Sequence, residues 1–199
     1  MEALLAARLP AAVSAVISNN PDARGLETAR DHGIAVATVD HRRFGSRESF
    51  DSALAQEIDR YGPDLVVLAG FMRVLSDAFV KRYAGRLVNI HPSLLPAFPG
   101  LHTHRRALEA GVRVHGCTAH FVTTVLDHGP VIIQAAVPVV PDDTEETLAA
   151  RVLAEEHRIY PQAVRWFCEG RVSVTADGRV RVDGVSAAER ALISPALDG

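Results

Sequence analysis

A carboxamide and an imidazole stand two residues apart at Asn89 and His91, where an apolar run gives way to a proline-rich loop. In a strand, residues i and i+2 point to the same face of the sheet, so both side chains can address one substrate atom. An asparagine N–H can stabilise a carbonyl oxygen that gains negative charge, and a histidine can move a proton near neutral pH. An arbitrary Asn-x-His triplet is more often a strand end followed by a turn, so this interpretation depends on the rest of the chain.

Short apolar runs alternate with longer helical segments, which is the pattern of βαβ construction. The sequence predicts strands over 11–18, 34–39, 65–69, 87–90, 115–123 and 131–139. It predicts helices over 25–32, 46–61, 76–83, 103–110 and 144–168, and a terminal hairpin over 172–182. The last two long strands are close enough in sequence to pair antiparallel, so we expect an α/β fold with a mixed, mostly parallel sheet flanked by helices. The strand over 87–90 brings Asn89 to the carboxyl edge of that sheet, where open α/β folds place their ligands.

The composition is that of an ordinary globular protein. The 199 residues, 48% hydrophobic and 23% charged, are most simply one domain over residues 1–199. A net charge of -3 gives no reason to expect nucleic acid or an anionic membrane as a partner. Two cysteines without a C-x-x-C arrangement fit a reducing cytoplasm, and no apolar run approaches the roughly 18 residues that span a bilayer. We expect a monomer or a homodimer.

Three segments together resemble the phosphoribosylglycinamide formyltransferases (glycinamide ribonucleotide transformylases) of the formyltransferase family. They are 66–75, the run of 89–96 followed by 98–104, and 116–134 with its Leu-Asp-His-Gly-Pro turn. The likeness covers residues 12–170 in the family's order and spacing. It implies a Rossmann-like fold and transfer of a formyl group from 10-formyltetrahydrofolate to the amine of glycinamide ribonucleotide, in purine biosynthesis.

Formyl transfer to an amine passes through a tetrahedral intermediate with an oxyanion and a protonated nitrogen. Asn89 can donate to the oxyanion and His91 can act as the acid or base. Asp127, at the turn between two expected strands, is the third candidate, because a nearby aspartate favours the charged imidazolium. A turn aspartate without a chemical role is the alternative for Asp127.

The resemblance also implies binding residues. Met72, Arg73, Val74 and Leu75 would form the pterin pocket together with Asn89, and Arg47 would lie near the folate donor. Glu156 would contact the nucleotide substrate, and His102 would bind substrate or order the loop. Each has a plainer alternative, since Val74 and Leu75 can be core residues and Arg73, Arg47 and Glu156 can be surface charges. His120 can line the floor of the site or simply be a satisfied strand histidine.

Nine histidines raise the question of a metal, and His102 and His104 are the obvious pair. Divalent metal sites usually need three or four convergent ligands. No helical H-x-x-x-H and no C-x-x-C supports such a set, so we expect no metal.

The chain departs from the family at its start. The family opens with a hydrophobic strand and a glycine-rich loop that holds the substrate phosphate with backbone N–H groups. Residues 1–7 resemble the helix after that loop. Either the true start lies upstream or the chain is a weakened relative, and we favour the first because the distal residues are intact.

Three other functions stay open. Hydrolysis of 10-formyltetrahydrofolate uses the same residues with water as acceptor, but that relative carries an extra N-terminal domain. Methionyl-tRNA formyltransferase shares the core and has a C-terminal RNA-binding domain, for which 199 residues leave no room. The non-enzymatic alternative is an inactive folate-binding remnant without the phosphate loop.

Overall fold

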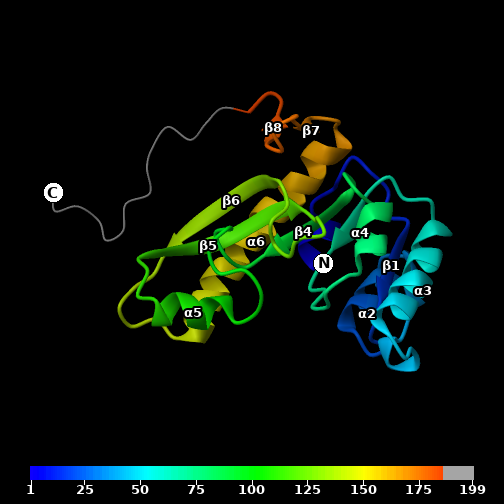
Figure 1. The fold of residues 1–199 in the computed structure, drawn as a ribbon, viewed down its shortest axis with the longest axis horizontal. Coiled ribbons are helices and arrows are strands. Elements are labelled where there is room, and N and C mark those ends of the chain that lie inside the picture. Colours follow the sequence, from blue (N-terminus) through cyan, green and yellow to red (C-terminus); the bar gives the residue numbers. More distant parts are fainter. Residues whose placement is uncertain (186–199) are drawn as a thin grey trace.

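A computed structural model describes residues 1–185 (Figure 1). The expected domain over residues 1–199 also includes 186–199, which lie outside the described part of the chain. Within residues 1–185, helices and short strands alternate along the chain as the sequence predicts. The helices of this part are all too short or too polar to cross a membrane.

The N-terminal part contains a two-stranded parallel sheet of β1 (Ala15–Ser18) and β2 (Ala35–Thr38). Strand β1 is shorter than the predicted 11–18, because residues 11–14 lie exposed ahead of the pairing with β2. A short α1 (Glu2–Ala6) precedes β1, and α2 (Arg24–Asp31) makes the crossover. After β2 come the 3-10 helix η1 (His41–Arg43) and α3 (Arg47–Asp59), which Ser46 caps through a reciprocal bond with Ser49.

The second sheet has four strands in the order β3-β4-β5-β6. Strands β3 (Val66–Leu68) and β4 (Leu87–His91) are parallel, and α4 (Asp77–Arg82) connects them. Strand β5 (Val114–Phe121) is antiparallel to both β4 and β6 (Val131–Pro138), and α5 (Thr103–Glu109) precedes it. The predicted mixed α/β architecture is confirmed, with parallel pairs before the proline-rich loop and antiparallel pairs after it.

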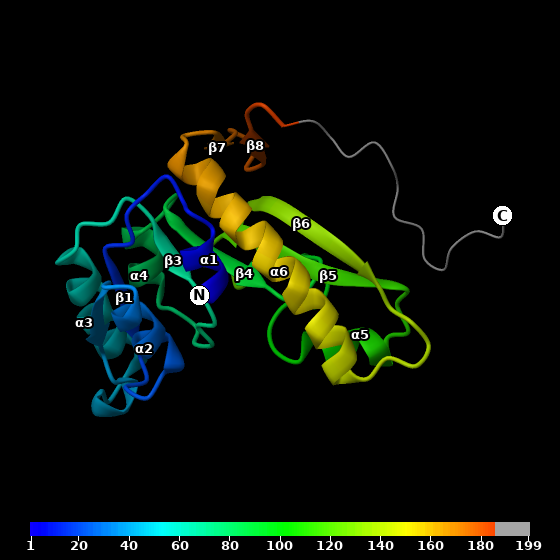
Figure 2. The same ribbon diagram turned by 180° about the vertical axis from the view of Figure 1, so that it is seen from behind.

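The long helix α6 (Glu145–Cys168) runs along one face of this sheet (Figure 2). Its Tyr160, Ala163 and Val164 are buried in one cluster with Val88 of β4 and Ala119 of β5. Burying a side chain as large as valine stabilises the fold by about 1.5–3 kcal/mol, so this contact holds β4 and β5 firmly. The predicted terminal hairpin is present as β7 (Val172–Val174) and β8 (Val180–Val182).

The two larger parts are not joined by a strand ladder. Within residues 1–185, β1 pairs only with β2, and β3 pairs only with β4. Side chains make the connection instead, since Ile17 of β1 and Leu68 of β3 pack on the same core as Phe50 of α3. The family's opening strand, which the resemblance places at the centre of the sheet, has no counterpart between β1 and β3 in the described residues.

Candidate functional site

The site is built on the carboxyl end of β4, where Asn89 and His91 share one face of the sheet. The antiparallel register places Asn89 opposite His120 and His91 opposite Thr118 on β5. Directly opposed residues of neighbouring strands lie on the same face. One face of the sheet therefore presents two polar rows side by side.

The imidazole of His91 lies between two hydrogen-bond acceptors. Its Nε2 atom is 3.1 Å from the carbonyl oxygen of Phe98, and its Nδ1 atom is 3.6 Å from Oδ2 of Asp127. The side chains of His91 and Asp127 are each only 8% exposed, so water screens their attraction weakly. A doubly protonated ring would have an acceptor facing each of its N–H groups. The structure thus brings two of the three expected catalytic residues together.

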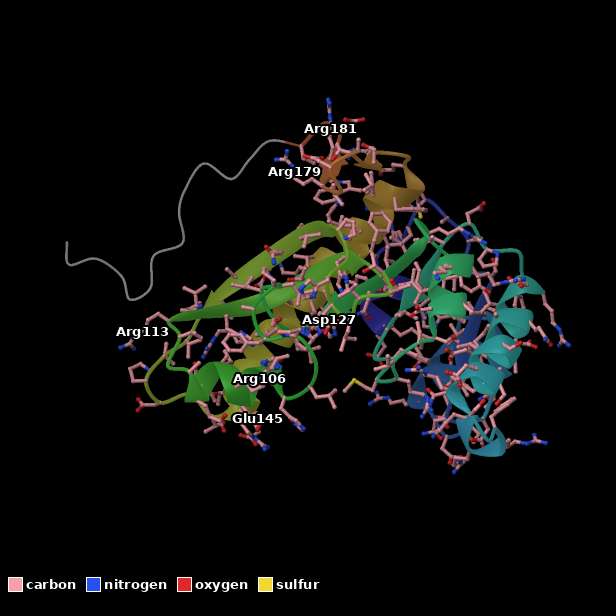
Figure 3. The ribbon with its side chains drawn as sticks, viewed as in Figure 1. Arg106, Arg113, Asp127, Glu145, Arg179 and Arg181 are labelled. Carbon is pink, nitrogen blue, oxygen red and sulfur yellow. The ribbon has the colours of Figure 1, made fainter. Side chains whose placement is uncertain are left out.

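Asp127 reaches His91 from the loop between β5 and β6. Its Oδ2 accepts a hydrogen bond from the backbone N–H of Gly100 at 2.8 Å, which ties this loop to the one after β4. Gly129 lets the loop after β5 fold back closely on the end of that strand. A Cβ atom at residue 129 would lie 1.7 Å from the carbonyl oxygen of Phe121. Asp127 lies near the middle of the molecule, away from the terminal hairpin (Figure 3).

The carboxamide of Asn89 is oriented by His120, a buried residue of β5. Nδ1 of His120 is 2.8 Å from the carbonyl oxygen of Phe121, so this nitrogen carries the proton that it donates. The other ring nitrogen, Nε2, can then accept from Asn89 Nδ2 at 3.4 Å. Burial lowers the pKa of His120, which favours this neutral form. One amide N–H of Asn89 is therefore held, and the second can donate to a substrate.

Two further histidines lie within electrostatic range of His91. The rings of His104 on α5 and His115 on β5 meet edge to face, with centroids 5.3 Å apart. Burial lowers the pKa of His115 to about 4, and burial also lowers the pKa of His104. Both rings are therefore largely neutral near pH 7 and add little positive charge beside His91.

The loops around the site carry left-handed backbone at residues other than glycine. Phe98, His102 and Asp127 have φ angles of 52°, 57° and 52°. Residues with a Cβ atom rarely adopt such angles, and this strain gathers at functional sites. The Phe98 carbonyl and the Asp127 carboxylate face His91 from two of these loops.

The four expected pterin residues follow β3 on the loop beside this face. Leu68, the last residue of β3, is paired with Asn89 in the register of β3 and β4, so the loop begins next to the site. Met72 and Val74 are 76% and 52% exposed, which leaves apolar surface open to a flat aromatic ligand. Leu75 is partly buried and packs on the core of α3, so only part of its side chain borders the loop.

Arg47 is the first residue of α3, and Arg73, on the loop after β3, contacts the same helix. The guanidinium of Arg73 is 5.3 Å from the ring centroid of Phe50, one turn after Arg47 on the same helix. Arg47 has a half-exposed side chain whose one ion pair in the described residues is with its neighbour Glu48, at 3.4 Å. Arg73 thus contacts α3 one turn from Arg47, and the expected role of both cations in folate binding stays a prediction.

Glu156 and His102 are not linked to the three central residues by any hydrogen bond or ion pair among residues 1–185. Glu156 lies on α6, and burial raises its pKa, which is unusual for a solvated helix charge. His102 is the residue that precedes α5, in left-handed conformation. Their expected contacts with substrate stay predictions.

Among the described residues, no three His, Cys, Asp or Glu side chains gather in a way that could hold a metal ion. His104, which the sequence suggests together with His102 as a candidate metal ligand, has its ring against that of His115.

Sequence reasoning missed the backbone groups of the site. The carbonyl of Phe98 contacts His91, and the N–H of Gly100 donates to Asp127. Both are backbone groups, so the type of side chain at these positions does not predict them. The run Phe-Pro-Gly-Leu-His does signal a tightly turned loop, and that signal marks their place. His115 was also missed, because nothing in the sequence distinguishes it from other strand histidines.

Comparison with known proteins identifies the class. A family model described as Formyl transferase matches residues 1–164. The chain therefore belongs to the formyl transferase family, and it is an enzyme of that class.

Individual similar proteins indicate which formyl transferases the chain resembles. The chain is 58% identical over 167 residues to phosphoribosylglycinamide formyltransferase of Escherichia coli (strain K12), covering 84% of this chain and 79% of the relative. Glycinamide ribonucleotide transformylase 1 from Symbiobacterium toebii superposes with a TM-score of 0.86 at 51% identity, over 91% of this chain and 85% of the other. A formyltetrahydrofolate deformylase from Pseudomonas syringae has a TM-score of 0.82 at 29% identity, with 92% of this chain and 62% of the other covered.

Proposed function

We propose that this protein transfers the formyl group of 10-formyltetrahydrofolate to the amine of glycinamide ribonucleotide, a step of purine biosynthesis. The observation that carries the proposal is the meeting of His91 with Asp127 on the face that also presents Asn89. The names of these two similar proteins support the choice of substrates.

Asn89 stabilises the oxyanion. The amine nitrogen attacks the formyl carbon, and the C=O electrons move onto oxygen. Since His120 holds one N–H of the Asn89 carboxamide, the other is pre-oriented for that oxygen. Loss of one such donor typically lowers the rate about 10²–10³-fold.

His91 and Asp127 manage charge and protons. A protonated His91 polarises the formyl oxygen, and Asp127 assists removal of a proton from the attacking amine, directly or through water. The departing folate nitrogen gains a proton as its bond to the formyl carbon breaks. Acid–base assistance of this kind contributes about 10²–10⁴-fold.

Binding is assigned to the surrounding loops. Met72, Arg73, Val74 and Leu75, with Arg47 and Asn89, hold the folate beside the end of β4, and exposed apolar side chains at Met72 and Val74 fit its aromatic ring. Glu156 and His102 bind the nucleotide substrate. The raised pKa of Glu156 fits a carboxylate in a poorly hydrated position that a polar ligand would complete.

We further propose that residues 1–199 act as one domain, as a monomer or homodimer, in the cytoplasm and without nucleic acid or membrane. The net charge of -3 and the unpaired Cys117 and Cys168 are compatible with this setting.

The test is an assay of the purified chain with 10-formyltetrahydrofolate, with and without glycinamide ribonucleotide. We expect formylated glycinamide ribonucleotide to appear in step with deformylated folate, and little formate without the amine. Formate release that does not depend on the amine would support the hydrolase instead. Folate binding without either product would support the remnant and contradict the proposal.

A further inference from the structure

We propose that Gln134 of β6, acting with Thr118 of β5, is a positioning residue that holds His91 in its working geometry. This inference rests on the proposed function, in which His91 takes part in formyl transfer. The two residues do not touch the His91 ring. Gln134 and Thr118 fix the first residues of the loop after β4, and a later residue of that loop, Phe98, contacts the His91 ring.

The sheet register aligns these residues. His91 is opposite Thr118, and Thr118 is opposite Gln134, so one cross-strand row runs over β4, β5 and β6. All three side chains lie on the same face, and the loop after β4 turns back over that face. Gln134 thus lies beside the loop with its side chain still exposed to solvent, although 43 residues of sequence separate it from His91.

Gln134 and Thr118 clamp residues 93–95 of this loop. Nε2 of Gln134 donates to the carbonyl oxygen of Leu95 and to Oγ1 of Thr118, both at 2.9 Å. The Thr118 hydroxyl donates to the carbonyl of Ser93 at 2.6 Å and accepts from the N–H of Leu95 at 3.1 Å. Both amide hydrogens of Gln134 and the full capacity of the hydroxyl are used. Thr118 and Ser93 are fully buried, so water does not easily replace a lost bond between them, whereas the Gln134 side chain is exposed at the edge of the clamp.

The clamp is connected to the catalytic pair along the loop. The Ser93 hydroxyl donates to the carbonyl of Ala97 at 2.6 Å, and the next carbonyl, that of Phe98, faces His91. Two residues further on, the N–H of Gly100 donates to Asp127. Arg106 of α5 also donates to the carbonyl of Pro99, so the loop is held at both ends. If residues 93–95 were released, the Phe98 carbonyl and the Gly100 N–H would both move away from His91 and Asp127.

The experiment compares Gln134→Met, Thr118→Val and Thr118→Ser in the full chain. We expect Gln134→Met and Thr118→Val to lower kcat by about 10–100-fold, since a shift near 1 Å at a reacting group costs up to about 100-fold. The KM for both substrates should stay within about threefold, because uniform binding is untouched. Thr118→Ser keeps the hydroxyl and should recover kcat to within about threefold. Gln162→Met on α6, outside the clamp, is the matched control and should change neither parameter.

A second readout separates positioning from loss of folding and does not depend on turnover. The His91 ring resonance, assigned by its loss in His91→Gln, should shift in Gln134→Met and Thr118→Val, with a changed titration midpoint. It should be unchanged in Gln162→Met and nearly unchanged in Thr118→Ser. An unshifted resonance in Gln134→Met would overturn the inference, whether or not kcat fell. If the parent chain shows no turnover, the proposed function is contradicted, but the positioning role is not. The His91 resonance in Gln134→Met still tests that role.

Discussion

The part around β1 and β2 and the part around β4, β5 and β6 are stabilised in different ways. Residues of β1 and β2 are at best half-buried, and the two strands pair only with each other. In β5 all residues after the first are buried, between β4, β6 and the long helix α6. Figure 2 shows α6 running along the second part, with α1 of the first part packed beside it. The residues that we assign to chemistry all lie in the better-buried part.

This difference predicts which kinetic quantity each part controls. Asn89, His91 and Asp127 come from β4 and the loop between β5 and β6, so changes there should lower kcat. Arg47 comes from α3, in the first part, and should affect folate binding alone. The two parts meet on the core around Phe50, where the expected folate loop also begins.

The largest effect is expected in the second part. His91→Ala and Asp127→Asn should each lower kcat by about 10²–10⁴-fold, because each removes acid–base or charge assistance made only in the transition state. Folate affinity, measured by fluorescence quenching or calorimetry, should stay within about threefold. A near-normal kcat in either variant would show that the buried pair is structural.

Amide exchange should separate the two parts directly. We expect backbone amides of β1 to exchange at least about 100-fold faster than those of β5, since local opening is easiest where few side chains are buried. Hydrogen–deuterium exchange followed by NMR or mass spectrometry measures this. Equal protection of both strands would mean that the first part is stabilised as strongly as the second.

Stability in acid should depend on a histidine of the second part. His115 binds a proton near pH 6.5 in the unfolded chain, but only near about 4 in the folded one. Between these values the unfolded state holds more protons, so the free energy of unfolding falls as the pH falls, by about 3 kcal/mol in all. Denaturant titrations from pH 7 to 4 test this. His115→Gln should reduce the dependence to the part that comes from His104 and His120, whose pKa burial also lowers, whereas His32→Gln, at an exposed residue after α2, should preserve it in full.

The smallest effect is expected in the first part. Arg47→Ala should raise the KM for 10-formyltetrahydrofolate by about 5–10-fold, with kcat within about twofold, because it removes one exposed charge–ligand contact. Arg60→Ala at the other end of α3 is the control, since its ion pair with Glu57 faces solvent. A fall in kcat without a change in KM would place Arg47 in the chemistry instead.

The sequence foresaw those features of the fold that follow from local patterns. Alternating apolar runs locate most of the elements, and the predicted terminal hairpin over 172–182 is present as β7 and β8. The early strand was predicted too long, because the mainly apolar residues 11–14 look like a strand but lie exposed. The start of β1 is set by its pairing with β2, which begins at Ala15 and which the local sequence does not encode.

The sequence predicts the parts of the site that consist of side chains on one strand. It does not predict the parts that depend on backbone conformation. Asn89 and His91 are two residues apart in the sequence, so their shared face follows from strand periodicity alone. The approach of Asp127 depends on the register of β4 with β5 and on left-handed backbone at Phe98 and Asp127, which residue types do not encode. The same holds for Gln134, whose role exists only through a cross-strand row.

A double-mutant cycle on the full chain tests most directly whether a buried histidine and a carboxylate from a distant loop work as one unit. The values of kcat/KM for His91→Ala, Asp127→Asn and the double variant are measured with both substrates. We expect the double variant to be within about threefold of the slower single variant, since a unit already broken loses little more. Losses that multiply, each single effect appearing in full in the double variant, would contradict the joint action of these two residues.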